Sequence, residues 1–365
     1  MRTPAAVPST AAGAGVLGLA LAARGVPTAM GAPEDVLRAV AATSTRARDG
    51  RFRNTEPSTP LLGSNVELLR ALLTRGRTGW PARPVPLAPL APPGPATPLA
   101  VTWYGHSSVL IEIDGRRLLA DPMWSERASP SRRIGPRRMH PAPAPLATLP
   151  PVDAVLISHD HYDHLDAPTV RSLLRLGDAP FVVPLGVGEH LRCWGVPRRR
   201  VVELDWGGTA EVAGIELRCT EARHFSGRGL TRNTTLWSSW GVTGPAHRAY
   251  FGGDTGYTAA FAEAGRGLGP FDLVLLPIGA YNHRWPDVHM TPEETVRAVD
   301  DLRGRVLLPV HWATFNLGFH SWAEPIERVR AAAASAGVRL VVPIPGQRLD
   351  LSATTELRDW WTAIA

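Results

Sequence analysis

Short apolar runs of strand length alternate with longer amphipathic runs along the chain after residue 98. The first two, 99–103 and 109–113, are followed by Asp114-Gly115, a dipeptide typical of a hairpin turn, and then by 117–120. The pattern therefore predicts that this region opens as an antiparallel meander. Further strands are expected at 154–157, 181–183, 215–219, 249–251, 273–276 and 306–310, and helices at 168–176, 187–194, 258–266, 292–302 and 325–336.

Strands and helices mixed in this order favour an α/β fold, in which two β-sheets pack together and helices cover their outer faces. The residues ahead of this region have a different pattern of hydrophobic and polar positions. Residues 34–77 have a helical pattern with polar interruptions, and 81–98 form a proline-dense linker that supports neither a helix interior nor a strand ladder. We therefore expect three parts: a terminal segment at 1–32, a helical extension with its linker at 33–97, and the main domain at 98–365.

The terminal segment carries a weak export signal. Arg2 precedes an apolar stretch at 11–23, and Ala20-Leu21-Ala22 offers a small-residue cleavage pattern. The stretch is too short to span a membrane and is rich in alanine and glycine rather than leucine. Two interpretations stay open: a disordered or helical extension of a cytoplasmic or peripherally membrane-associated bacterial protein, or a signal or anchor for export.

The composition is that of a globular chain, with 44% hydrophobic residues. A net charge of +6 would suggest a nucleic-acid partner if the cations were clustered. All 39 basic residues are arginine and they are spread along the chain, as in proteins from GC-rich genomes, so no nucleic-acid partner is expected. The two cysteines, Cys193 and Cys219, lie in no metal-ligand spacing and are predicted to be buried and structural.

The most informative stretch covers residues 158–164 and reads Ser-His-Asp-His-Tyr-Asp-His, directly after an apolar run. His159 and His161 are two residues apart, so an extended backbone turns both rings to the same side. Asp163 and His164 follow the bend and can bind a second ion. A solvated polar loop would rarely collect three of the chain's 12 histidines so closely. The spacing therefore predicts half of a dinuclear metal site.

More ligands should then lie at other strand ends, because a closed metal site needs groups from separated segments that converge on one edge. His224 follows the run 215–219, Asp254 follows an apolar run and two glycines, and His311 follows the run 306–310. Each of these residues alone could be an ordinary loop residue. Suitable ligand types at three successive strand ends favour a metal site.

This His-x-His-x-Asp-His motif, with His, Asp and His at later strand ends, resembles that of the metallo-β-lactamase superfamily. Within it the chain resembles the branch of N-acyl-phosphatidylethanolamine-hydrolysing phospholipase D, over residues 98–347. The resemblance implies an αββα sandwich. Residues 49–54 also resemble a segment found ahead of the catalytic domain in this branch. The matching strings lie at 102–106, 120–122, 153–166, 203–206, 252–257, 269–273, 277–281 and 311–312.

The resemblance also implies the roles of individual residues. Asp254 and His289 are expected to be catalytic, Tyr162 and His289 to contact substrate, and His106 and Asp121 to support the ligands. The cofactor is expected to be two divalent ions, zinc by analogy, although histidine and carboxylate sites also bind iron or manganese. One ion is assigned to His159, His161 and His224 and the other to Asp163, His164 and His311, with Asp254 as the bridge.

The expected activity is hydrolysis by direct attack of an activated water. The chain has no lysine for a His-x-Lys motif and no Gly-x-Ser-x-Gly elbow, so no covalent intermediate is expected. The first hypothesis is a zinc phosphodiesterase acting on lipids such as N-acyl-phosphatidylethanolamine at a membrane surface. The 12 tryptophans would suit an apolar groove, although tryptophan is more often buried in a core.

A second hypothesis is a lactonase or other small-molecule hydrolase of the ascorbate-6-phosphate lactonase type. A wide apolar groove would favour the lipid and a small polar pocket the lactone. A third is a non-catalytic protein that kept the fold, which would require lost ligands. A nuclease would need a basic stripe, which the sequence lacks. The oligomeric state stays open.

Overall fold

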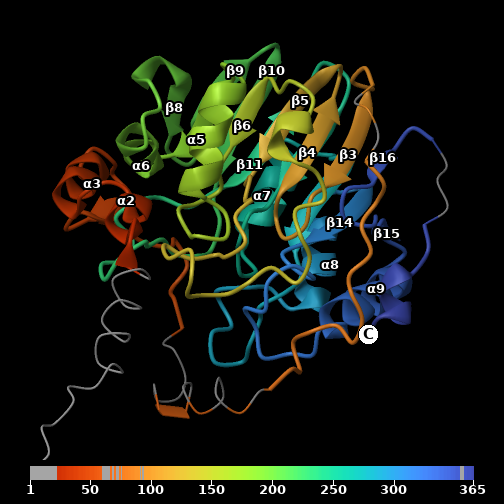
Figure 1. The fold of residues 1–365 in the computed structure, drawn as a ribbon. Helices are drawn as coiled ribbons and strands as arrows, with labels where there is room; N and C mark the ends of the chain where they lie inside the picture. The colour runs from red at the N-terminus through yellow and green to blue at the C-terminus, as the bar shows by residue number, and fades with distance from the viewer. Residues whose placement is uncertain are drawn as a thin grey trace, which may run out of the picture.

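Two mixed β-sheets form the centre of the protein. The computed structural model describes residues 23–59, 66–67, 70, 74, 76–90, 92, 94–353 and 357–365. In these residues each sheet has seven strands, and helices lie outside both sheets (Figure 1). The predicted α/β sandwich is therefore confirmed. The export signal predicted at 11–23 lies almost entirely outside the described residues, among which no helix is long and apolar enough to cross a membrane.

The first sheet begins with the predicted antiparallel meander and continues with parallel strands. Ile113 pairs with Arg116 and Val109 with Ala120, as the two-residue turn Asp114-Gly115 requires, and Leu99 pairs with Ile113 in the preceding hairpin. Both faces of the central strands are buried, which explains their continuous apolar runs. In spatial order the strands are β16 (Arg348–Asp350), β3 (Leu99–Trp103), β4 (Val109–Ile113), β5 (Arg116–Ala120), β6 (Ala154–Leu156), β7 (Phe181–Pro184) and β8 (Val201–Leu204).

The second sheet has the same division into an antiparallel and a parallel half. Its antiparallel half comes first in the chain, and the parallel half carries the most apolar runs. In spatial order the strands are β15 (Arg339–Leu340), β14 (Val306–Val310), β13 (Leu273–Pro277), β12 (Arg248–Phe251), β11 (Ser239–Thr243), β10 (Ile215–Thr220) and β9 (Thr209–Val212).

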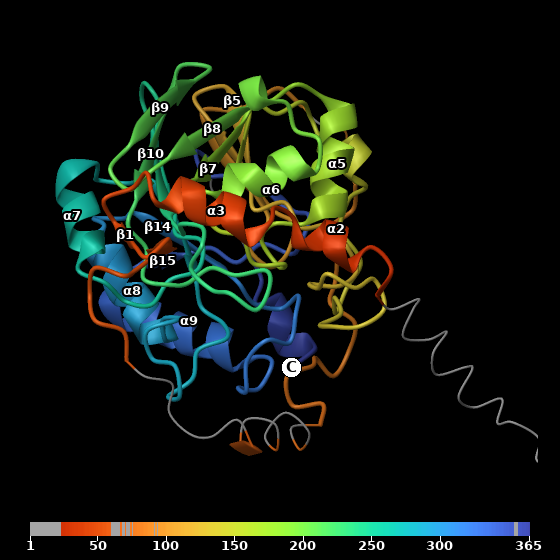
Figure 2. The ribbon, with the colours of Figure 1, turned by 90° about the vertical axis from the view of Figure 1, so that its left-hand side faces the viewer.

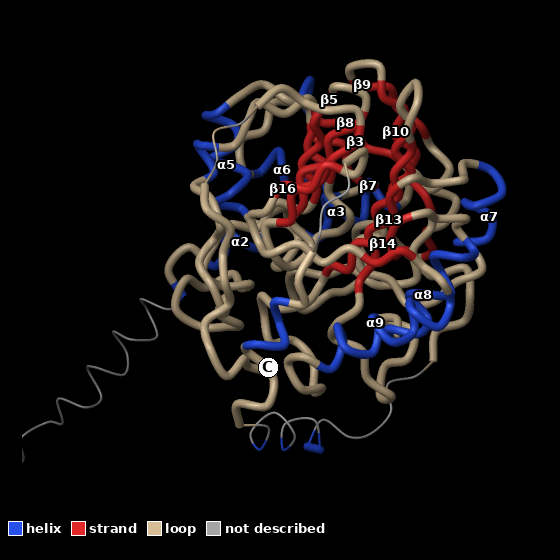
Figure 3. Tube along the Cα trace, turned by 90° about the vertical axis from the view of Figure 1, so that its right-hand side faces the viewer, coloured by secondary structure: helices blue, strands red, loops and turns tan. Residues whose placement is uncertain are grey.

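The helices form the two outer layers, with α5 (Ala167–Leu176) and α6 (Val187–Cys193) on the first sheet (Figure 2). The other sheet is covered by α7 (Ala260–Gly267), α8 (Pro292–Asp301) and α9 (Glu324–Ala336), while the strands occupy the centre (Figure 3). All five agree with the predicted helices to within two residues at each end.

The core between the sheets holds much of the aromatic content. Trp103, Trp240 and Tyr250 are almost completely inaccessible to solvent. Nine of the 12 tryptophans are buried, and none of the other three is fully exposed. Most tryptophans therefore stabilise the fold and give little support to an apolar groove.

The extension ahead of the first sheet differs from the predicted helical region. It contains α2 (Val26–Met30), α3 (Glu34–Ala41) and a short hairpin of β1 (Ala47–Arg48) and β2 (Arg51–Phe52). Asp49 and Gly50 both have positive φ, as a tight hairpin turn demands, and this turn overrides the helical pattern. Figure 2 shows α2 and α3 lying against the side of the sandwich that carries α6.

The prediction of two buried cysteines is wrong for Cys193, which is exposed, whereas Cys219 is buried; both are free thiols. Cys193 ends α6, whose buried residues Val187, His190 and Leu191 share one face at helical spacing. A residue two positions beyond Leu191 points away from that face.

Candidate metal centre

The seven predicted ligands come together at one edge of the sandwich, where strands of both sheets end. The loop after β6 carries four of them, and one more follows each of β10, β12 and β14. The described residues include four overlapping groups of possible metal ligands, and all of these groups lie in this one place.

The first group brings three histidines and one aspartate together. The Nε2 atom of His159 lies 2.8 Å from Nδ1 of His161, and Nε2 of His224 lies 3.3 Å from the same atom. All four ligand atoms, including one of Asp254, lie within 4.8 Å of one another. This is the set that the resemblance implied for the first ion, with Asp254 as the bridge.

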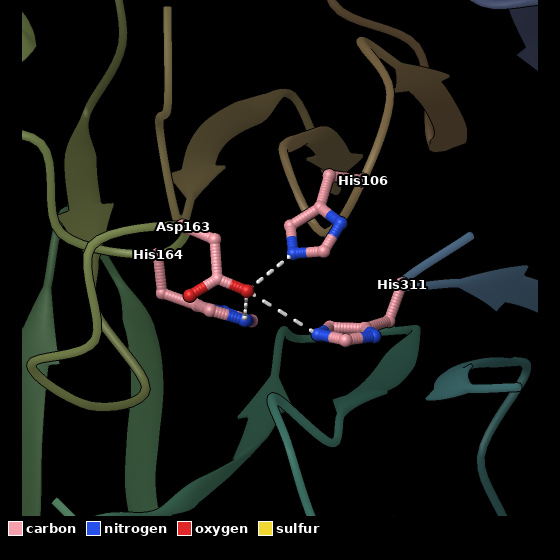
Figure 4. Close-up of side chains that lie close together, drawn as sticks. All are labelled: His106, Asp163, His164 and His311. Atoms are coloured by element: carbon pink, nitrogen blue, oxygen red, sulfur yellow. Dashed lines mark hydrogen bonds and ion pairs between the residues drawn. The ribbon is translucent and has the colours of Figure 1, made fainter. Parts of the chain in front are cut away.

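The second group surrounds the carboxylate of Asp163 (Figure 4). The Oδ2 atom of Asp163 lies 3.4 Å from Nε2 of His311 and 3.5 Å from Nε2 of His164. A third ring also reaches it, since Nε2 of His106 is 2.8 Å away. The sequence predicted His106 only as support, and the structure adds it to the possible ligands.

Asp254 lies between the two groups. Its Oδ2 atom is 3.0 Å from Nε2 of His311 and 3.1 Å from Nε2 of His164. The same oxygen is 3.8 Å from Nε2 of His224 and 3.9 Å from Nε2 of His159. One carboxylate oxygen thus faces histidines of both sets, as a bridging ligand must.

The donor set fits divalent ions such as zinc. The Oδ1 atom of Asp254 is buried without a hydrogen-bond partner among the described residues, and the Nε2 atoms of His164 and His311 meet the carboxylates as ion pairs without the geometry of a hydrogen bond. Orphaned buried polar atoms are costly unless something else satisfies them. Ligands bonded at 2.0–2.1 Å around a tetrahedral ion stand about 3.3 Å apart, close to the spacing of these atoms.

Neighbouring groups orient the rings through the nitrogen that faces away from the centre. The Oδ2 atom of Asp121 lies 2.7 Å from Nδ1 of His164, and the carbonyl oxygen of Val288 lies 3.0 Å from Nδ1 of His224. The Ser158 hydroxyl donates to Asp121. Bonds of this kind fix the tautomer that leaves Nε2 free to bind a metal. The contact with His164 agrees with the supporting role predicted for Asp121.

Neighbouring histidines keep the two buried carboxylates, Asp163 and Asp254, in their ionised forms. Burial alone would raise the pKa of Asp254, but His164 and His311 outweigh it and hold the pKa well below its usual value. Burial also holds the pKa values of His159 and His224 well below the usual value, so their rings are uncharged. Ionised carboxylates and neutral imidazoles are the forms that bind metals.

Two of the other three histidines, His164 and His311, bind protons until a metal displaces them. Burial opposes a charge on His164, but Asp254 and Asp163 outweigh it and raise the pKa of His164 well above its usual value. The same balance raises the pKa of His311 to about 9. These two rings counter the charge of the buried carboxylates, as a metal ion would.

His289 lies beside the ligands, and its predicted roles in substrate contact and catalysis stay predictions. Its Nδ1 atom is buried without a hydrogen-bond partner in the described chain and lies 4.0 Å from Oδ2 of Asp254. Burial lowers the pKa of His289 to about 3, so the ring is neutral near pH 7. The residue also lines a hollow of about 460 Å³ together with polar side chains such as those of Tyr281, Asn282 and Glu324.

Tyr162 is half-buried, and its contacts point to packing. Its hydroxyl donates to the carbonyl oxygen of Arg228 over 2.6 Å, and the Arg228 guanidinium lies 4.0 Å from the centre of its ring. These contacts hold the ring beside the metal loop. A contact between Tyr162 and substrate stays a prediction.

Sequence reasoning missed Asn54, whose side chain reaches the main chain of His224. The only signal was that residues 49–54 resemble a segment found ahead of the domain, which gives no contact. No local pattern connects residues that lie so far apart in the chain.

Comparison with known proteins now identifies the family. A model of the beta-lactamase superfamily domain matches residues 116–312 of the chain. The chain belongs to the beta-lactamase superfamily. This confirms the predicted family and, with it, the predicted class of metal-dependent hydrolase.

Similar proteins align with the chain beyond the residues that the superfamily model matches. An uncharacterised protein of Mycobacterium tuberculosis is 53% identical and the alignment covers 99% of this chain and 98% of the relative. N-acyl-phosphatidylethanolamine-hydrolyzing phospholipase D 1 of Caenorhabditis elegans is 38% identical over 64% of this chain and 69% of the relative. The solved structure of Igni18, a metallo hydrolase of Ignicoccus hospitalis, shares the superfamily fold with a TM-score of 0.54, 23% identity, and coverage of 69% and 97%.

Proposed function

We propose that the protein is a dinuclear zinc phosphodiesterase that cleaves lipids such as N-acyl-phosphatidylethanolamine in the manner of a phospholipase D. The observation that carries the dinuclear part is the position of Asp254, whose single Oδ2 atom faces histidines of both ligand groups. The substrate class is supported by the named phospholipase D of Caenorhabditis elegans, which is 38% identical.

The ligands divide into two sets around that oxygen. Bound there, the two ions would lower the pKa of a shared water toward about 7 and neutralise charge on a phosphoryl oxygen. One set would be His159, His161 and His224, and the other Asp163, His164 and His311, with Asp254 common to both.

The protein's own side chains then have distinct tasks. Asp254 holds a second oxygen, Oδ1, that is buried and unpartnered in the described residues, so it can orient the attacking water or accept its proton. His289 is neutral near pH 7, so its ring N–H can donate a hydrogen bond to a phosphoryl oxygen or to the oxygen of the leaving alcohol. Tyr162 would hold the loop that carries the ligands.

Two hollows in the described residues offer room for the substrate, and the first of them borders the metal centre. One, of about 460 Å³, borders His289 and is lined largely by polar side chains. The other, of about 530 Å³, is lined in part by Trp80, Trp124 and Met139. A polar and a partly apolar hollow support a lipid with a polar head group, which would be met at a membrane surface.

Zinc-loaded protein should be assayed on vesicles of N-acyl-phosphatidylethanolamine in water enriched in oxygen-18, with the Asp254→Asn variant as the inactive control. The proposal expects release of N-acylethanolamine, with the label in phosphatidic acid, because water attacks phosphorus. Label in the released alcohol would contradict that route.

A lactonase is the second candidate, and the polar lining of the hollow beside His289 favours it. A soluble lactone should therefore be tested in parallel. Turnover of the lactone without release from the vesicles would replace the lipid proposal with this one.

A further inference from the structure

Asn54, in the extension ahead of the sandwich, binds both main-chain polar groups of the predicted ligand His224. Its Nδ2 donates to the carbonyl oxygen of His224 over 2.9 Å, and its Oδ1 accepts from the amide of His224 over 3.1 Å. The same Oδ1 accepts from Nε1 of Trp237 over 3.1 Å. A single carboxamide therefore pairs with both polar groups of one ligand's backbone.

The backbone next to His224 is fixed at Arg223, which forms an isolated bridge with Gly256 and whose amide donates to the Thr255 hydroxyl, but His224 itself lies beyond that bridge. It lies four residues beyond the end of β10, outside any ladder, and within the described chain no other hydrogen bond reaches its main chain. Its ring is held by Val288, whose carbonyl oxygen lies 3.0 Å from Nδ1. Backbone position and ring orientation together determine where Nε2 points, so Asn54 contributes to the position of that atom.

Hydrogen bonds and burial fix the residues on both sides of Asn54 to the sandwich, so the backbone that carries the Asn54 carboxamide is held in place. Phe52 is fully buried, and its amide donates to the carbonyl oxygen of Asn233 over 2.8 Å. The Thr55 hydroxyl donates to Glu221 over 2.9 Å. Further contacts join Glu56 to Thr258 and Ala259, and Pro57 to Arg223.

We propose that Asn54 is a positioning residue for the ion assigned to His159, His161 and His224, and that residues 52–57 are part of the metal centre. The inference rests on the proposed ligand set and deepens it. Partners that orient metal ligands typically account for about 10- to 100-fold in metal affinity. Asn54→Ala should therefore weaken one ion by about that factor and leave the other unchanged.

The hydrogen bonds lost in Asn54→Ala should affect His224 and not the hydrophobic core. In Asn54→Ala, Nε1 of Trp237 keeps a second acceptor, the carbonyl oxygen of Ala222 at 2.9 Å. The two main-chain groups of His224 lose their only partner in the described chain. Asn54→Asp tests the donor half alone, because it keeps an acceptor for the amide of His224 but places a carboxylate oxygen against its carbonyl oxygen.

The experiment is a stepwise titration of the metal-free full-length protein with zinc against a competing chelator. Variants are Asn54→Ala, Asn54→Asp and the control Thr55→Val, which removes only the neighbouring bond to Glu221. Cobalt absorption shows which set of ligands is filled, because the two sets differ in their histidine and carboxylate content. We expect two ions in the wild type and in Thr55→Val, and one weakened ion, in the set with His224, in both Asn54 variants.

Three outcomes would overturn the inference: unchanged affinities in both Asn54 variants, equal weakening of both ions, or equal weakening in Thr55→Val. If Asn54→Ala does not fold, the isosteric Asn54→Asp decides alone. A wild-type protein that binds fewer than two ions would contradict the proposed ligand set itself, and the inference with it. Two wild-type ions with unaffected Asn54 variants would contradict the inference only.

Discussion

Replacement of Asp121 by asparagine should weaken the binding of one ion and leave the fold intact. Asp121 is fully buried and accepts from the amide and the hydroxyl of Ser158, over 2.7 and 2.6 Å, while its Oδ2 lies 2.7 Å from Nδ1 of His164. Asp121 has φ of 39°, a conformation that asparagine tolerates better than most residues. The change therefore exchanges one oxygen for an NH₂ group with little backbone strain.

The consequence follows from the hydrogen bonds that remain possible. If the amide oxygen stays with the Ser158 amide, the NH₂ group faces Nδ1 of His164, where two donors would meet. His164 can relieve this conflict by moving its proton to Nε2, but that tautomer cannot bind a metal through Nε2. Loss of such a partner costs about 10- to 100-fold in metal affinity, which corresponds to about 1.4–2.7 kcal/mol.

The assay is zinc binding by equilibrium dialysis against a chelator, with unfolding in urea measured in parallel. The matched control is Asp166→Asn, a buried aspartate that caps α5 through the amide of Thr169. Asparagine caps a helix about as well as aspartate, so this control should change the free energy of unfolding little and should not affect the ions. The reasoning fails if Asp121→Asn keeps both ions at wild-type affinity, or if only the ion of the other set is weakened.

Three further predictions concern the centre and the sheet. Asp254→Asn should abolish hydrolysis and reduce bound metal while circular dichroism stays native. His289→Ala should lower kcat by about 10²- to 10⁴-fold with two ions still bound; loss of metal on elemental analysis would make it a ligand instead. Burial would raise the pKa of Glu112, but Arg348 and the Thr97 amide outweigh it and lower the pKa. Its ionised form therefore stabilises the fold above the unfolded value near 4.5, and this contribution is lost as the pH falls through the lowered pKa. Glu112→Gln should thus cost about 1 kcal/mol at pH 7, given the partly exposed Arg348, and almost nothing in acid, as urea unfolding at both pH values would show.

The sequence predicted the inner strands better than the outer ones. Inner strands such as β13 and β14 are buried on both faces, so their continuous apolar runs are unambiguous. The four edge strands, β16, β8, β15 and β9, were not predicted, because short edge strands carry charged and exposed residues and resemble loops. The central strand β11 was missed for another reason: its serine and glycine lower strand propensity, although the strand is largely buried.

The ligand positions could be predicted because two rules of geometry act locally. The loop after β6 gives its spacing directly, and the ends of neighbouring strands converge at one edge, which brings Asp254 and His311 to the same place. Neither rule says which side chains hold the ligands. His106 reaches Asp163 across 57 positions, and Asn54 reaches His224 across 170, so no periodicity connects them.

Long-range contacts of the extension bear on the boundary that the sequence predicts near residue 98. Composition changes sharply there, and the first sheet begins at Leu99, so the sequence favours a separate module ahead of a complete hydrolase. Yet Phe52 belongs to the same buried core as the sheets, and Asn54 supplies the partners for the main chain of His224. A change in composition marks where regular packing begins, not where the functional unit begins. On the role proposed for Asn54, the metal centre extends across the boundary, and its smallest complete unit includes residues 52–57.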